Sequence, residues 1–510
     1  MFLEKRNRKI IPRWRDFFTT LELGELDSPT TTPRKDVFGT DSLLEKRAEW
    51  EKHRLSLWHA TDFLAAAFVL NQQHQAFDAA SFIVANGSHS TRAAVNLAKK
   101  VLNNPLPVTS LLPELESRED VHRQIHYSRE RLKKEPRNAI AWIELARNHT
   151  IVGQIEQASR AVRIACALSP DNRFVLRSAA RFLVHGREPL EAHRLLRTAS
   201  ATASDPWLLA AEIGVSSSAG VGPRFALAAR KMLSNESLPP GSTTELASAL
   251  ATLELDDGKM KLAKRLFHLS LNRPTENSVA QAEWASGHIA GLQEEVEKSL
   301  IPTTYEALAE SSLSKNNWHD SLIAATYWQN DQPFSARPAI FGSYLCSLML
   351  ENYQEAVRFL NVGLLANPNH PTLVNNMAFA LLNMGRTEEA EKWLSSVDVP
   401  PESDHAGISL LATRGMLLFR KGLPGLGREC YRKAIEIATK KSLPKYQVMA
   451  LLYLAREELR ASTLEAHLSL SAAVDEMQRY SDRDVSLLAG RIAGLLDHTD
   501  DFNPKEGTTK

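Results

Sequence analysis

Apolar residues along most of the chain recur three or four positions apart, which is the spacing of a helix with one buried face. The stretch 141–170 reads AWIELARNHTIVGQIEQASRAVRIACALSP and contains no cluster of acids, bases or thiols. Gly153 divides this stretch and Pro170 ends it. Glycine suits a tight turn and proline cannot continue a helix. The pattern therefore predicts two antiparallel helices joined by a short turn.

This helix pair recurs with a period of 34 residues, which is the separation of Pro136 and Pro170. Positions 4, 7, 8, 15, 20, 27 and 32 of the unit that begins at Ala139 hold, in order, Trp142, Leu145, Ala146, Gly153, Ala158, Ala165 and Pro170. The pattern strongly resembles the tetratricopeptide repeat family, although His149 replaces the usual aromatic residue and Val162 a larger one. The resemblance implies an all-α fold, a right-handed α-solenoid of helix hairpins.

The same frame can be followed through most of the chain. Further units begin at Arg173, Trp207, about Thr244, Pro302, Arg337, Pro371 and about Ile408. We expect a basic, aromatic N-terminal arm and flexible linker at 1–42, a helical region of degenerate repeats or a cap at 43–134, a first array at 139–277, an irregular helical junction at 278–301, a second array at 302–441, capping helices at 445–496 and a disordered tail at 497–510.

Composition narrows the possible functions. The chain has 510 residues and a net charge of +1, which argues against a surface given over to nucleic acid. It contains no run of about 18 apolar residues, so we expect no membrane span. Cys166, Cys346 and Cys430 lie far apart, which provides neither a disulfide framework nor metal-ligand spacing and fits a cytoplasmic protein.

The sequence offers no persuasive catalytic motif. GVSSSAGVG at 214–222 lacks the Gly-Lys-Ser/Thr ending of a phosphate-binding loop, and we interpret it as the turn of a repeat. The pair His319-Asp320 follows Trp318, where the second helix of a unit should begin. No GxSxG motif occurs. We therefore predict a protein that is not an enzyme and uses neither a metal nor another cofactor.

The tetratricopeptide resemblance implies a concave groove, lined by the first helix of each unit, that binds a ligand. In the first two units the matching positions are Glu144, Arg147, Arg177, Arg181 and His185. Arginines could bind an acidic peptide, a carboxyl terminus or a phosphate, because a guanidinium group can donate two parallel hydrogen bonds. The alternative is a solvated surface with local ion pairs, for instance to Glu144.

A second set of candidates lies in the unit from Pro371. Asn375, Asn376, Phe379 and Asn383 occupy its groove positions. An asparagine amide can pair with both the N–H and the C=O of an extended peptide, which would place a partner segment here. The same amides could instead link neighbouring helices.

The N-terminal segment 5–18, KRNRKIIPRWRDFF, carries six basic residues and one acidic residue among several large apolar ones. Its docking candidates are Arg13, Trp14, Arg15 and Phe17. The segment could pack along the solenoid as a cap or inhibitory arm, or it could dock a partner protein. A third alternative is contact with nucleic acid or an anionic membrane.

These patterns together predict a non-enzymatic scaffold or regulatory subunit that binds a protein or peptide partner within a multi-protein bacterial system. One alternative is a helical-repeat protein that binds nucleic acid, which the charge balance opposes. Another is an enzyme with an unrecognised site in 43–134.

Overall fold

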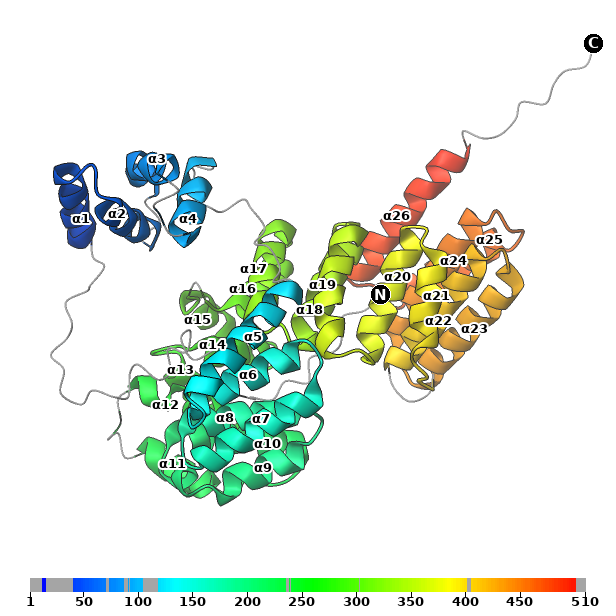
Figure 1. The fold of residues 1–510 in the computed structure, drawn as a ribbon. Coiled ribbons are helices and arrows are strands. Elements are labelled where there is room, and N and C mark those ends of the chain that lie inside the picture. Colours follow the sequence, from blue (N-terminus) through cyan, green and yellow to red (C-terminus); the bar gives the residue numbers. More distant parts are fainter. Residues whose placement is uncertain are drawn as a thin grey trace, which may run out of the picture. The chain divides into compact units, whose positions relative to one another are not determined.

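The computed structural model describes residues 12–14, 40–69, 73–86, 90, 92–103, 118–234, 238, 240–301, 303–400 and 405–500. Regular structure in these residues is helical, and they contain no strand (Figure 1). The predicted all-α solenoid is therefore confirmed. The chain forms two compact units, Leu26–Leu112 and the combination of Met1–Glu25 with Pro113–Lys510.

The smaller unit is a helical bundle with a core of its own. It contains α1 (Thr40–Lys52), α2 (Leu57–Val69), α3 (Phe77–Ala85) and α4 (Arg92–Asn103), with a short 3₁₀ helix at Gln73–Ala76. Trp50, Phe63, Leu64 and Ile83 are buried between these helices. The predicted region 43–134 is divided, because the helix that follows, α5 (Arg118–Lys134), packs against the larger unit.

The larger unit is a succession of helix hairpins that starts after α5. The pairs are α6 (Ala139–Ile151) with α7 (Ile155–Leu168), α8 (Arg173–His185) with α9 (Pro189–Thr198), α10 (Pro206–Ala219) with α11 (Ala226–Ser234), α12 (Pro240–Asp256) with α13 (Met260–Ser270), α14 (Glu276–Ser286) with α15 (Leu292–Lys298), α16 (Tyr305–Ser314) with α17 (Trp318–Asp331), α18 (Ala336–Tyr344) with α19 (Tyr353–Ala366), α20 (Pro371–Asn383) with α21 (Thr387–Ser395), α22 (His405–Arg420) with α23 (Pro424–Lys440) and α24 (Pro444–Arg460) with α25 (Ala466–Met477). A short 3₁₀ helix, Ser200–Ala203, precedes α10, a π-helical turn, Leu345–Met349, extends α18, and α26 (Arg483–Asp500) follows the last pair.

Three local expectations can be compared with these boundaries. The segment 278–301, expected to be irregular, belongs to the short hairpin of α14 and α15. GVSSSAGVG is helical up to Ala219, and the turn begins only at Gly220, which has a positive φ. His319 and Asp320 lie in the first turn of α17, where the side chain of Asn317 accepts a hydrogen bond from the Asp320 N–H.

The turn inside a hairpin uses a residue in the left-handed conformation. Gly153 has a φ of +74°, and the N–H of the next residue, Gln154, donates to the carbonyl of His149 at 2.8 Å. Gly385 has a φ of +76°, and the turn there closes in the same way. Such turns satisfy carbonyl groups that the end of a helix leaves free. A glycine at this position therefore indicates the turn where it is present, whereas Arg187, Asn316 and Glu351 adopt a positive φ in the turns of other hairpins.

Hairpins far apart in the sequence also meet. Most first helices contact the first helix of the next hairpin, as α10 contacts α12 and α20 contacts α22. Beyond these neighbours, α6 in the first hairpin contacts α19 in the seventh. A Cβ atom added to Gly153 would lie 2.3 Å from the carbonyl oxygen of Leu365 in α19. The succession of hairpins therefore returns to its own beginning.

The C-terminal helix α26 does more than cap the last hairpin. Its Asp484 accepts a hydrogen bond from the hydroxyl of Tyr344 at 2.6 Å and an ion pair from Lys445 at 2.6 Å. Arg483 donates to the carbonyl of Leu313 at 2.7 Å, and Arg491 donates to that of Met349 at 3.1 Å. The helix thus joins the sixth, seventh and tenth hairpins.

The contact between the first and seventh hairpins can be tested with two alanine substitutions. Gly385→Ala meets no atom within 4 Å and should cost about 1 kcal/mol, because only the left-handed backbone is penalised. Gly153→Ala carries the same backbone penalty and must also displace the Leu365 carbonyl, so we expect a loss of about 2–4 kcal/mol. Urea unfolding of both variants would measure the difference. Equal losses would show that the two hairpins do not touch in solution.

Candidate partner-binding site

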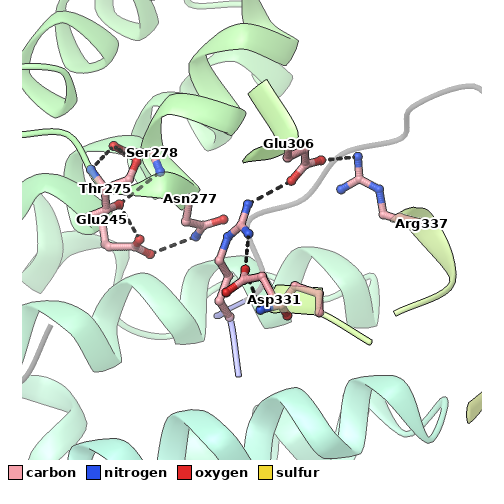
Figure 2. Close-up of polar contacts among 9 residues, drawn as sticks. Glu245, Thr275, Asn277, Ser278, Glu306, Asp331 and Arg337 are labelled. Atoms are coloured by element: carbon pink, nitrogen blue, oxygen red, sulfur yellow. Dashed lines mark hydrogen bonds and ion pairs between the residues drawn. The ribbon is translucent and has the colours of Figure 1, made fainter. Parts of the chain in front are cut away.

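Residues 12–14 of the N-terminal arm lie against residues of the first, second and sixth hairpins. The Arg13 guanidinium forms two ion pairs, from Nη2 to Glu306 Oε2 at 3.0 Å and from Nη1 to Asp331 Oδ2 at 3.2 Å. The Arg13 side chain is 8% exposed and that of Glu306 is 3% exposed. Arg337 contacts the other oxygen of Glu306 at 2.6 Å, so Glu306 lies between two guanidinium groups (Figure 2).

The positions of the two carboxylates explain why they receive a cation. Glu306 lies in the first turn of α16, where the helix dipole favours a negative charge. Asp331 is the last residue of α17, where the dipole disfavours one. The two nitrogens of Arg13 reach a different acid each, which the single ammonium of lysine could do less well.

Trp14 fills an aromatic pocket and is 0% exposed. Its ring centroid lies 6.1 Å from that of Phe182 and 5.5 Å from that of Phe334. Its carbonyl accepts a long hydrogen bond, 3.4 Å, from Nε of Arg147. The indole Nε1 has no hydrogen-bond partner in the described part of the chain. The pocket therefore packs against the Trp14 ring, and none of its described residues accepts a hydrogen bond from the indole N–H. We call Glu306, Asp331, Phe182 and Phe334 the arm site.

Two predicted groove residues border the arm site. The guanidinium of Arg181 lies 4.9 Å from the centre of the Phe334 ring and pairs with no carboxylate among the described residues. Burial, together with the charges of Arg337 and Arg13, lowers the pKa of Arg181 to about 10. The ring of His185 lies 5.8 Å from that of Phe334. Burial and the charge of Arg181 lower the pKa of His185 to about 4, so this imidazole is neutral at pH 7.

Arg177 belongs to a network that links neighbouring hairpins. It is 4% exposed and donates to the carbonyl of Trp207 at 3.0 Å, with its guanidinium 5.0 Å from the centre of the Trp207 ring. A second nitrogen lies 3.8 Å from Glu245. Glu245 accepts from Thr275 at 2.8 Å and from Asn277 at 2.9 Å, as Figure 2 shows. The network crosses α8, α10, α12 and α14.

The remaining candidates of the first two units are also engaged. Arg147 is buried and reaches the carbonyl of Asp331 at 3.5 Å, in addition to that of Trp14. Glu144 is half-buried and has an interaction partner. Arg147, Arg181 and His185 are thus brought to one place, whereas Arg177 faces the neighbouring network. A role in partner binding stays a prediction for all of them.

The asparagines of the unit from Pro371 bond between helices. Asn376 donates to Ser343 in α18 at 3.2 Å, and Asn375 accepts from Thr413 in α22 at 2.8 Å. Both side chains are buried. These contacts agree with the alternative that the amides link neighbouring helices.

The other two candidates of that unit are Phe379 and Asn383, which also contact neighbouring groups. Asn383 donates to the carbonyl of Phe379 at 2.9 Å, and the Phe379 ring lies 5.5 Å from that of Tyr453. Their predicted contact with a partner is not tested by these bonds. Arg15 and Phe17 of the predicted docking set lie outside the described residues.

Sequence reasoning missed the two acids of the arm site. Glu306 is the fifth residue of the unit from Pro302. The groove candidate Arg177 is the fifth residue of its own unit, so the same position could have identified Glu306. Asp331 ends a second helix, and no positional rule marks it.

Two further properties of the described residues are relevant to function. They contain no group of three or more histidine, cysteine, aspartate or glutamate side chains arranged to hold a metal ion. None of the helices they form has the length and apolar character needed to cross a membrane.

A sequence model described as a tetratricopeptide repeat matches residues 347–410. No curated protein matches the chain. Among solved structures, the Cut9–Hcn1 hetero-tetramer of the APC/C is similar at 11% identity, with 89% of this chain and 97% of that chain covered and a TM-score of 0.38. Yeast Tom70 is similar at 13% identity, with coverage of 91% and 96% and a TM-score of 0.30. Naa15/Naa10 bound to HypK-THB is similar at 13% identity, with coverage of 92% and 88% and a TM-score of 0.25.

Arg177 and Arg181 lie one turn apart on α8 and should respond differently to alanine. Arg177→Ala leaves the Trp207 carbonyl without its donor and Glu245 without its cation, so we expect a loss of about 2–3 kcal/mol. Arg181→Ala removes only the contact with Phe334 and should cost about 0.5 kcal/mol. Urea unfolding would measure both. Similar losses would contradict the assignment of Arg177 alone to the inter-hairpin network.

His185 should make stability depend on pH. Its pKa in the folded protein, about 4, lies below the ordinary 6.5, so the unfolded chain takes up this proton first as the pH falls. The folded state should therefore lose stability between pH 6.5 and pH 4. In His185→Gln the urea midpoint should fall less between pH 7 and pH 5 than in the wild type. Burial also lowers the pKa of His149, but this residue is present in both proteins. Parallel pH profiles would contradict the assignment.

Proposed function

We propose that this chain, a tetratricopeptide-repeat protein, is a non-enzymatic scaffold that binds a protein or peptide partner on its inner face, as part of a multi-protein system. The inner face is the surface that the first helices of successive hairpins form together. One observation carries the proposal: residues of this face, together with Asp331 at the end of α17 and Phe334 just after it, already hold residues 12–14 through the side chains of Arg13 and Trp14.

The chemistry of that contact is typical of protein recognition. Arginine and tryptophan are the residue types that most often dominate the energy of an interface. Here an arginine is held by two carboxylates and a tryptophan is fully buried between aromatic rings. A surface with a clamp of acids and an aromatic pocket can bind another segment of the same kind. Arg181, which pairs with no described carboxylate, is available beside it for an acidic group of the partner.

The state of the cysteines supports a non-enzymatic role. Burial raises the pKa of Cys166 to about 11 and raises that of Cys346 further. A cysteine acts as a nucleophile through its thiolate, which such an environment disfavours. Tyr344, whose pKa burial also raises, is bonded to Asp484 in a contact that anchors α26. These two thiols and this hydroxyl are therefore engaged in packing.

Affinity capture with two matched variants tests the proposed surface. The full chain would be used to capture cross-linked partners from extracts of the source cells. Arg181 on α8 faces the arm site, whereas Arg194 lies on α9 of the same hairpin, with its side chain 75% exposed. Arg181→Glu removes a cation from the inner face and gives Arg13 of the arm another carboxylate. The Arg181→Glu variant should therefore recover at least about tenfold less of a specific partner than the wild type does.

The second variant is the control for a change of charge on the same hairpin. Arg194→Glu should leave recovery within about twofold of the wild type, because the side chain faces solvent. Hydrogen exchange on the purified pair should show new protection in first helices more than in second helices. Loss of binding in both variants, or in neither, would exclude the inner face as the binding surface.

A further inference from the structure

We infer that the arm site recognises a partner segment in which an arginine is followed directly by an aromatic residue, and that Arg13 and Trp14 are the chain's own competitor for that site. The inference rests on the proposed function, since it names the class of partner that the inner face binds. It goes further by assigning the specificity to four residues.

The arginine half of the site is selective because two separate acids must be satisfied. Glu306 and Asp331 belong to different helices, α16 and α17, and each takes a different nitrogen of the guanidinium. When the arm leaves, each of the two carboxylates loses its ion pair with Arg13. Removing one partner from a buried ion pair is costly. The vacated site therefore favours another guanidinium.

The aromatic half of the site selects for a ring. Phe182 and Phe334 contact the Trp14 ring at an edge and at a tilt, which are favourable arrangements for two aromatic groups. The indole Nε1 has no partner in the described part of the chain. A phenylalanine at this position would lose some contact area but no hydrogen bond. The site should therefore accept several aromatic residues and reject small ones.

The described residues of the arm are held mainly through their side chains. Arg13 contacts acids 293 and 318 residues further along the chain. Residues 12–14 belong to no helix or strand, and the backbone contact of Trp14 with Arg147 is long at 3.4 Å. Arg13 and Trp14 thus contact the inner face as a bound peptide would. A tethered segment competes at an effective concentration of about a millimolar, so a partner must bind more tightly than the arm or arrive when the arm is released.

A fluorescent peptide of residues 9–18 tests the inference on the full-length chain. In the double variant Arg13→Ala with Trp14→Ala, the chain's own segment can no longer fill the site. We expect this variant to bind the peptide at least about tenfold more tightly than the wild type does, because the tethered competitor is gone. Adding Glu306→Gln and Asp331→Asn to the double variant should abolish the gain.

Altered peptides test the specificity. Replacing the tryptophan that corresponds to Trp14 by phenylalanine should change the affinity less than about threefold, whereas alanine should weaken binding at least about tenfold. Lysine in place of the arginine that corresponds to Arg13 should bind more weakly than arginine. If the double variant melts like the wild type and binds no peptide, or binds the alanine peptide equally well, the inference is wrong.

A second design covers the case in which the double variant does not fold. A protease site placed in the segment 28–33 of the otherwise unchanged chain allows the arm to be cut after folding. Exchange of the cut arm for the labelled peptide would support the inference. Failure to exchange would identify the arm as a permanent part of the core and overturn it.

The two proposals can fail separately. If Arg181→Glu prevents capture of a partner but no peptide enters the arm site, only the inference about the arm fails. If the peptide binds as expected while Arg181→Glu and Arg194→Glu behave alike in the capture experiment, the proposed scaffold surface fails instead.

Discussion

Each helix hairpin in this protein leaves one apolar face uncovered until the next hairpin packs on it. Ala146 and Ala158 are fully buried in the first hairpin because small side chains let its helices approach closely. The outer side of that hairpin still needs α5 before it and α8 after it. Stability is therefore a property of the array, as expected for solenoid proteins, and the ends of the array need special elements. Helices α5 and α26 meet that need by packing on the hairpins.

Return of the array to its own start changes the environment of its polar residues. Where α6 meets α19, side chains that would face water in an open groove lie among other protein groups. Charges in such surroundings need partners. Arg177 obtains Glu245, and Glu306 obtains Arg13 and Arg337. Several charges of the inner surface are consequently paired, and the arm supplies one member of such a pair.

The sequence correctly predicted those structural features that depend only on residues within about one repeat of each other. Gly153 and Pro170 marked the ends of helices correctly, because turn conformation and helix termination are local properties. The partners of Arg147, Arg177 and Asn376 in other hairpins lie 30 or more residues away. Which residues meet at such distances depends on small rotations that accumulate from hairpin to hairpin, and no spacing rule contains them. The course of α26 and the second acid of the arm site, Asp331, were missed for the same reason.

The separation between Trp14 and Phe334 has a consequence for biosynthesis. The arm leaves the ribosome before its pocket can form, because the pocket is complete only after roughly 320 further residues have been made, about 20–60 s later at usual rates of translation. During that interval Trp14 has no Phe334 to pack against. Docking of the arm closes a very long loop and must come late. A docked arm thus reports that the first six hairpins have been made, and a nascent chain with a free arm is one in which the sixth hairpin is not yet in place.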